Sequence, residues 1–171
     1  YLLNDLLDLQ DDRQHHRKRH RPLASGAVPI KSVLLLFPLL TLTAFAGAAW
    51  LLPQQFVLAL LCYYGLTLSY SLLLKRYMGV DVIVLATLYT LRVIAGTFAF
   101  GVTLTFWMLA FSMFLFLSLA LVKRCAELEE MKLVEATHTP GRGYQTADLP
   151  TLRGMGLASG FLAVLVLALY I

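Results

Sequence analysis

Apolar residues along this 171-residue chain come in long blocks separated by short polar segments. A helix needs about twenty apolar residues to cross roughly 30 Å of hydrocarbon, and the blocks have about that length. Four complete blocks and a shorter fifth one cover residues 31–50, 56–74, 80–100, 104–122 and 155–171. Because the runs are continuous and do not alternate as barrel strands do, they predict an all-α, multi-pass transmembrane bundle.

The composition agrees with a chain that folds in lipid. Hydrophobic residues make up 59% and charged residues 14%, both outside the range of soluble domains. The chain begins at Tyr1 rather than Met and stops at Ile171 inside an apolar run, so we expect one partial transmembrane domain over residues 1–171, without its outer helices. Cys62 and Cys125 should lie at different depths and do not predict a disulfide.

Positive charges mark one side of the expected membrane. The connections near Pro53 and at residues 101–103 hold no Lys or Arg, whereas the other polar segments hold thirteen of the fourteen; Arg92 lies within a span. This positive-inside pattern predicts an integral protein of the cell membrane with its polar chemistry on the cytoplasmic side. The formal charge of +4 is explained by basic residues at helix ends, so we expect no nucleic-acid partner.

The first twelve residues hold an acidic pattern of helical spacing. Asn4, Asp8 and Asp12 recur every four residues with Asp5 and Asp11 beside them, which predicts an oxygen-lined stripe about 12 Å long. Magnesium takes one or two carboxylates and completes its shell with water and phosphate oxygens, so a bound diphosphate would suit this stripe. The alternative is a solvated helix end whose acids pair with the bases that follow.

The order of residues carries a family resemblance. The stretch reads N-D-x-x-D-x-x-x-D-R from Asn4 to Arg13, and then R-P-L-x-x-G from Arg21 to Gly26. It resembles the first aspartate-rich motif of the UbiA prenyltransferase superfamily. That resemblance implies a bundle of about nine helices, of which this chain would supply five to six, and a Mg²⁺-dependent transfer of a polyprenyl group from its diphosphate to an acceptor.

The resemblance also assigns roles to single residues. It implies Asn4, Asp8 and Asp12 as metal ligands and, together with Asp5, as catalytic residues. It implies that three arginines contact phosphate: Arg13, Arg17 and Arg21. In such a mechanism an allylic carbocation forms in a dry cavity, and the aromatic residues that could face it are Tyr63, Tyr64 and Tyr70.

Two further positions are candidates for substrate binding. The run Tyr70-Ser71-x-x-x-Lys75-Arg76 is similar to a family turn whose Lys points toward the phosphates, although a simple cytoplasmic stop of positive charge would look the same. Arg92 is costly inside a span, and we expect it to line the cavity or to pair with an acid on another helix. Asp81, three helical turns earlier, is explained by the positive end of its helix.

A departure from the family pattern follows the fourth block. Many members carry a second aspartate-rich motif there, whereas this chain reads Lys123-Arg124-x-x-Glu127-Leu128-Glu129-Glu130. Lys123, Glu127 and Glu130 share a helix face and would form either a reduced acidic site with a phosphate-binding base or a salt-bridged helix end. We therefore include Lys123, Arg124 and Glu127 among the candidate substrate-binding residues.

The same run leaves the reaction open between two branches of the family. Lys-Arg-x-Ala-Glu-Leu with Tyr-Ser-x-x-x-Lys resembles the branch that transfers phosphoribose from phosphoribosyl diphosphate to a polyprenyl phosphate. The lipid partner is then an isoprenoid diphosphate donor or a polyprenyl phosphate acceptor. A transporter would place charges at mid-membrane on several helices, where essentially Arg92 alone is found, and a scaffold would need no acidic stripe.

Overall fold

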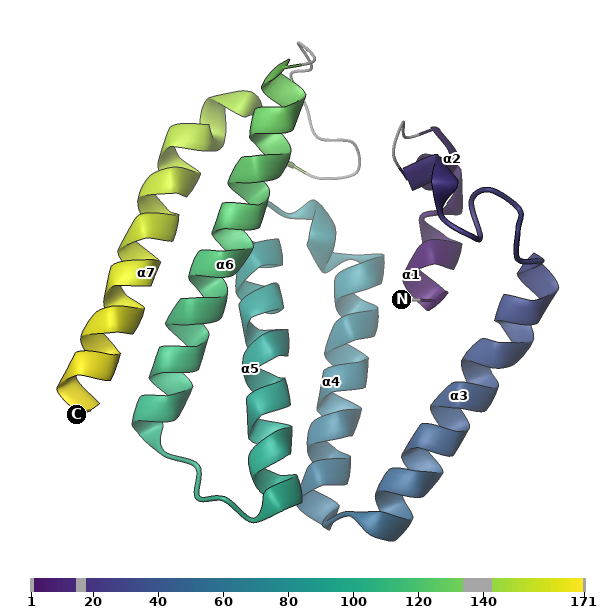
Figure 1. Ribbon diagram of the computed structural model, residues 1–171, viewed down its shortest axis with the longest axis horizontal. Helices are drawn as coiled ribbons and strands as arrows, with labels where there is room; N and C mark the ends of the chain where they lie inside the picture. The colour runs from purple at the N-terminus through teal and green to yellow at the C-terminus, as the bar shows by residue number, and fades with distance from the viewer. Residues whose placement is uncertain (1, 15–17, 134–142, 171) are drawn as a thin grey trace. The chain divides into compact units, whose positions relative to one another are not determined.

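The computed structural model describes residues 2–14, 18–133 and 143–170, apart from a few side chains, which are those of Asn4, Asp11, Gln14, Lys18 and Leu133. This part of the chain is helical and contains no strand (Figure 1). It divides into two compact units, residues 1–57 and 58–171. The predicted all-α architecture is confirmed.

The first unit begins with two short helices rather than one. Helix α1 (Leu2–Leu7) and helix α2 (Leu9–Gln14) are separated at Asp8, whose carbonyl oxygen still accepts a hydrogen bond from the Asp12 amide at 2.8 Å. The single continuous helix expected for the acidic stripe is therefore interrupted. Short acidic side chains compete for backbone hydrogen bonds and disfavour the helix interior, which accounts for a break among so many aspartates.

A short 3-10 helix and a long helix complete the first unit. The 3-10 helix η1 (Lys18–His20) leads to α3 (Ile30–Leu51), against which α1 packs. Helix α3 starts after the extended Pro29 and ends at Leu51; its cap, Leu52, is extended because the ring of Pro53 disfavours helical backbone at the residue before it. Helix α4 (Gln54–Leu72) begins in this unit and continues into the second.

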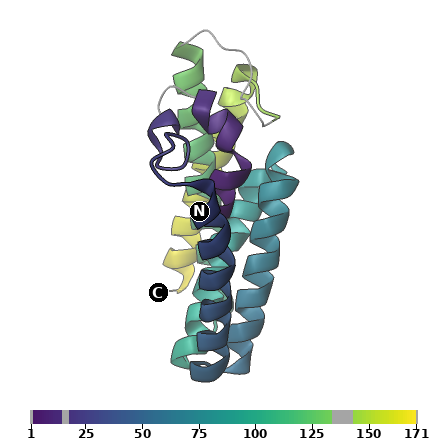
Figure 2. The ribbon, with the colours of Figure 1, turned by 90° about the vertical axis from the view of Figure 1, so that its right-hand side faces the viewer.

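The second unit is built around α5, α6 and α7. After η2 (Leu74–Arg76) come α5 (Val80–Phe100), α6 (Phe106–Leu133), η3 (Thr146–Asp148) and α7 (Leu149–Tyr170). Helix α6 packs along α7 and along α5, and the α6–α7 pair is visible in Figures 1 and 2. Gly79 and Gly101 flank α5 with φ of 78° and 65°, a backbone conformation that glycine adopts without strain.

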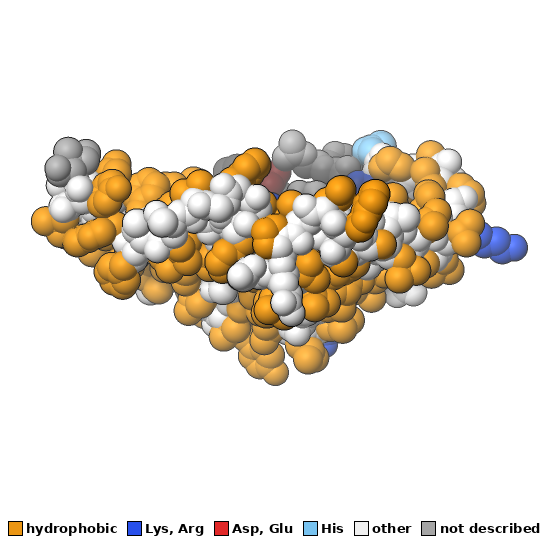
Figure 3. Space-filling model, turned by 90° about the horizontal axis from the view of Figure 1, so that it is seen from below, with side chains coloured by type: hydrophobic (Ala, Val, Ile, Leu, Met, Phe, Trp, Pro, Cys, Tyr) orange, Lys and Arg blue, Asp and Glu red, His pale blue; other side chains and the backbone are white. Residues whose placement is uncertain are grey.

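Within the described residues, five helices are long and apolar enough to cross a membrane, as the sequence predicted. Two of them differ in extent from the prediction. Helix α6 continues past Val122 through the charged run as far as Leu133, and α7 starts six residues early because Pro150 is tolerated in a first helical turn. Large hydrophobic side chains remain exposed along all five, and the face shown in Figure 3 is mostly hydrophobic.

The core of the second unit lies near one end of the bundle, where the connector between α6 and α7 returns to the helices. It combines residues of α5, α6 and α7 with one tyrosine of the connector: Val82, Ala120, Leu121, Cys125, Leu128, Tyr144, Leu149 and Leu152. Among the residues of this unit that the structure describes, the charged ones other than Arg92 also lie at this end of the helices.

Candidate functional site

One arginine gathers two carboxylates in the first unit. The Arg21 Nη1 atom lies 2.9 Å from the Asp5 Oδ1 atom and 2.8 Å from the Asp12 Oδ2 atom. The Arg21 side chain is 43% exposed and that of Asp5 30%, whereas Asp12 is buried at 4%. Asp5 and Asp12, which are seven positions apart, thus bind the same nitrogen of Arg21, and the arginine is the most exposed of the three side chains.

Of the other predicted site residues of this unit, Arg13 and Asp8 are described, whereas Arg17 and the side chain of Asn4 are not. Arg13 is exposed, and its Nε atom donates a hydrogen bond to the Ala24 carbonyl oxygen at 3.3 Å. Asp8 is half-buried at the break between α1 and α2. Arg17 and the side chain of Asn4 lie outside the described residues. Their assignment as a phosphate contact and a metal ligand stays a prediction.

The two carboxylates pair with a following base, as the alternative to a metal site predicts, and they are also ligands of the kind that a phosphate-binding magnesium ion takes. Such an ion takes one or two carboxylates and leaves its other positions to water and phosphate oxygens. Asp5 and Asp12 supply two carboxylates at one spot, with a cationic side chain beside them for a phosphate oxygen. Within the described residues no group of three or more His, Cys, Asp or Glu side chains could hold a metal by itself.

A second Asp–Arg pair lies in the second unit and is buried from solvent. The Arg124 Nε atom lies 2.7 Å from the Asp81 Oδ2 atom, and these side chains are 2% and 0% exposed. Arg124 also contacts Glu127 through Nη1, and its Nη2 atom donates to the Tyr70 hydroxyl at 3.3 Å. Three predicted substrate-binding residues, Tyr70, Arg124 and Glu127, are therefore brought together from α4 and α6.

Two members of this cluster were not predicted to take part in it. Asp81 was explained by its helix end, and Tyr144 lies in a polar connector that was assigned no role. The Tyr144 hydroxyl donates to the Asp81 Oδ1 atom and accepts a hydrogen bond from the Gly79 amide at 2.9 Å. The one signal available in the sequence was Asp81 itself, an acid that starts an apolar span.

The basic residues around the cluster are more accessible. Lys75 is half-buried in η2, and Lys123 is exposed on α6 next to Arg124. Lys123 shares its helix face with Glu127 and Glu130, as predicted, because α6 runs unbroken through this segment. The ammonium groups of Lys75 and Lys123 are thus separate from the buried Asp81–Arg124 pair.

Arg92 is surrounded by aromatic rings. Its Nε atom donates to the Tyr63 hydroxyl at 3.1 Å, and its guanidinium carbon lies 5.1 Å from the ring centres of both Tyr63 and Tyr89. Tyr89 in turn stacks on Phe116 at 5.2 Å. Arg92 follows the start of α5 by twelve residues, or about 18 Å, which is mid-membrane depth. The sequence suggested a cavity wall or an acidic partner and did not suggest these cation–π contacts.

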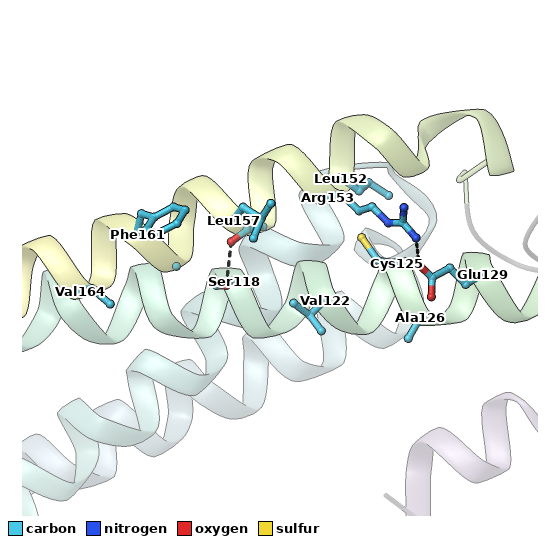
Figure 4. A pocket seen from close by; sticks show the side chains of 12 residues that line it. Ser118, Val122, Cys125, Ala126, Glu129, Leu152, Arg153, Leu157, Phe161 and Val164 are labelled. Carbon is cyan, nitrogen blue, oxygen red and sulfur yellow. Dashed lines mark hydrogen bonds and ion pairs between the residues drawn. The ribbon is translucent and has the colours of Figure 1, made fainter.

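An open apolar cavity of about 640 Å³ lies between α6 and α7 (Figure 4), and neither Asp81 nor Arg124 lines it. Ser118 donates a hydrogen bond to the Gly156 carbonyl oxygen at 2.9 Å along it, and the ion pair of Glu129 and Arg153 marks its polar end. Its lining suits hydrocarbon rather than phosphate chemistry. We therefore take the acidic segment of the first unit as one candidate site and the basic helix ends of the second unit as another.

Comparison with known proteins identifies the family of this chain. Residues 1–171 match the UbiA prenyltransferase family. The chain is 38% identical over 171 residues to the uncharacterized protein y4nM of Sinorhizobium fredii, covering all of this chain and 33% of that protein. It is 34% identical over 181 aligned residues to the nodulation protein NoeC of Azorhizobium caulinodans, covering all of this chain and 55% of NoeC.

A third relative has a named reaction. The chain is 37% identical over 128 residues to the decaprenyl-phosphate phosphoribosyltransferase of Mycobacterium tuberculosis, covering 75% of this chain and 42% of that enzyme. The chain thus spans between a third and about half of the length of these relatives. Because the match to the family model runs over every residue of the chain, and because the helices and the acidic motif agree with it, this membrane-spanning chain belongs to the UbiA prenyltransferase family.

Proposed function

We propose that this chain is the diphosphate-binding part of a Mg²⁺-dependent membrane transferase whose site faces the cytoplasm. The observation that carries the proposal is the convergence of Asp5 and Asp12 on Arg21, in a stretch that resembles the family's first aspartate-rich motif. A bound Mg²⁺ would neutralise charge on the leaving diphosphate. Arg21 would turn one of its donors toward a phosphate oxygen, since guanidinium groups bind phosphate in two-point geometry.

The donor we favour is phosphoribosyl diphosphate, with a polyprenyl phosphate as acceptor. In this reaction the bond between ribose C1 and the diphosphate oxygen breaks, and an oxygen of the lipid phosphate forms the new bond to C1. The leaving group is inorganic diphosphate. Support comes from the phosphoribosyltransferase relative, which matches three quarters of this chain, and from the Lys123–Glu127 run that stands where a second aspartate-rich motif is common.

The aromatic residues also favour sugar transfer over prenyl transfer. A prenyl carbocation is stabilised by ring faces that are open to it. Here the Tyr63 ring lies over the Arg92 guanidinium and the Tyr70 hydroxyl accepts from Arg124, so two of the three tyrosines considered for that role already serve arginines. A fixed positive charge at Arg92 would further oppose a carbocation nearby.

Prenyl transfer from an isoprenoid diphosphate is the second candidate. The observation that favours it is the complete N-D-x-x-D-x-x-x-D-R motif, which in the prenyl-transferring branch binds the diphosphate of the donor. The acidic segment would do the same work in both reactions. The two candidates differ in whether the lipid enters as donor or as acceptor.

The two donors can be compared directly on the full-length protein in detergent or lipid nanodiscs. Release of diphosphate is measured with phosphoribosyl diphosphate plus decaprenyl phosphate, and with geranylgeranyl diphosphate plus an aromatic acid. We expect Mg²⁺-dependent release with the first pair and little with the second. Release only with the second pair would select prenyl transfer, and no release with either donor, with or without Mg²⁺, would overturn the proposal.

A further inference from the structure

Arg124 is too deeply enclosed to bind a substrate through its charge. Its side chain is 2% exposed, and its three guanidinium nitrogens are directed at Asp81, Glu127 and Tyr70. These partners come from α5, from the next turn of α6 and from α4. The guanidinium therefore ties three helices together at the polar end of the second unit.

Asp81 extends this link to the connector before α7. One of its oxygens accepts from the Arg124 Nε atom and the other accepts from the Tyr144 hydroxyl. Burial, together with the hydrogen bond to Asp81, raises the pKa of the Tyr144 phenol above its ordinary value. The hydroxyl thus keeps its proton at neutral pH and remains the donor that the buried carboxylate needs.

The connector in turn touches the basic turn that precedes α5. The oxygen of Tyr144 accepts from the Gly79 amide at 2.9 Å, and a Cβ atom added at Gly143 would lie 3.1 Å from the Arg76 carbonyl oxygen. Backbone approaches backbone here, and a side chain at position 143 would be crowded against the carbonyl oxygen of Arg76. The turn at residues 74–79, with Lys75 in it, is thereby fixed to the same cluster as Arg124.

A buried ion pair stabilises a fold less than the short distance between its charges implies, because the loss of hydration of both charges offsets their attraction. Such pairs can instead select one arrangement of the groups around them, when every donor and acceptor is satisfied. Here Asp81 accepts on both oxygens and Arg124 donates from all three nitrogens. A buried network that is satisfied in this way favours one arrangement of the helices and the connector around it.

We propose that Asp81, Arg124 and Tyr144 form a positioning cluster, which holds the Lys75 turn and the Lys123 face of α6 in the arrangement that binds a phosphate-bearing substrate. Tyr144 acts through Asp81 and through the Gly79 amide, and it does not itself touch the substrate. This inference rests on the proposed function for the identity of the ligand. The geometry of the cluster stands apart from it.

The test removes one oxygen atom. In the full-length protein, Tyr144→Phe keeps the ring but deletes the hydroxyl that joins Asp81 to Gly79. We expect faster hydrogen–deuterium exchange of the amides at 74–79 and a dissociation constant for Mg²⁺-diphosphate about tenfold higher by calorimetry. The control Tyr170→Phe, at an exposed tyrosine near the far end of α7, should leave both unchanged.

A coupling experiment separates positioning from general loosening. If Tyr144 acts through the Lys75 turn, the affinity losses of Tyr144→Phe and Lys75→Ala should overlap, so that the double variant binds diphosphate little worse than Lys75→Ala. Unchanged exchange at 74–79 in Tyr144→Phe, or fully additive losses, would overturn the positioning cluster. Absence of diphosphate binding by the unsubstituted protein would count against the proposed function, while the exchange measurement would still decide whether the cluster holds the turn.

Discussion

The chain carries two Asp–Arg clusters that use the same chemistry in opposite surroundings. In the first unit Arg21 bridges Asp5 and Asp12 and is 43% exposed. In the second unit Arg124 holds Asp81 with 2% exposure. The first arginine can exchange a carboxylate for a phosphate because solvent and ligand reach it. The second would have to break a buried network to do so, and in the positioning cluster that we propose it holds helices together.

The contrast shows that a motif alone does not separate binding from support. Arg21 and Arg124 both stand in charged runs of the sequence and both were predicted to contact substrate. A charge near the surface costs little to re-pair, whereas a buried charge that loses its partner carries the full cost of lost hydration. The two clusters should therefore respond to substitution in different measurements.

The largest expected effect is on the stability of the buried cluster. Arg124→Ala would leave Asp81 as an uncompensated buried charge, for which we expect a loss of about 3–5 kcal/mol in the free energy of unfolding. Thermal or denaturant unfolding of the full-length protein in detergent measures it. Lys132→Ala, an exposed residue of the same helix, is the control. An Arg124→Ala protein as stable as the parent would show that the network does not support the fold.

The next effect is on catalysis at the exposed cluster. Asp12→Asn keeps an oxygen that accepts from Arg21 but removes the negative charge that a metal requires. We expect the rate of Mg²⁺-dependent diphosphate release to fall about 100-fold with little change in unfolding temperature. Asp148→Asn is the matched control, because Asp148 caps η3 through an oxygen that Asn also provides. Equal losses from both substitutions would argue against a metal ligand at Asp12.

Local patterns in the sequence were sufficient to place the membrane-spanning helices. A run of twenty apolar residues predicts a spanning helix without knowledge of its neighbours, and the five helices occur where those runs lie. The pairing of the first acids with a following arginine was also foreseen as an alternative to metal binding. Both properties depend on residues that are close in the sequence.

The buried cluster depended on contacts that periodicity does not encode. Asp81 meets Arg124 across 43 positions and Tyr144 across 63, so the pairing follows from how α5, α6 and the connector pack. The same limit applies to Arg92, which was expected to line a cavity or to pair with an acid on another helix, and whose guanidinium contacts the rings of Tyr63 and Tyr89. Which partner a buried charge finds is decided by packing, and the sequence shows only that it needs one.

A smaller effect tests the accessible side of the second unit. Lys123 is exposed beside the sealed Arg124, so Lys123→Ala should leave stability unchanged and raise the KM for phosphoribosyl diphosphate about tenfold. Steady-state kinetics with varied donor measures it, again with Lys132→Ala as control. If geranylgeranyl diphosphate proves to be the better donor and Lys123→Ala leaves its KM unaltered, the sugar-binding role of Lys123 is wrong.

The smallest effect is expected where an ion pair is exposed on both sides. Arg153 and Glu129 bridge α7 and α6 near the polar end of the apolar cavity, with side chains 57% and 48% exposed. Surface pairs contribute little because solvent screens them and two long side chains must be ordered. Arg153→Ala should therefore shift the unfolding temperature by less than about 2 °C. If Arg153→Ala shifted the unfolding temperature as much as Arg124→Ala, exposure would not separate the charges that stabilise the fold from those that do not. The comparison between the two Asp–Arg clusters would then rest on their numbers of hydrogen bonds.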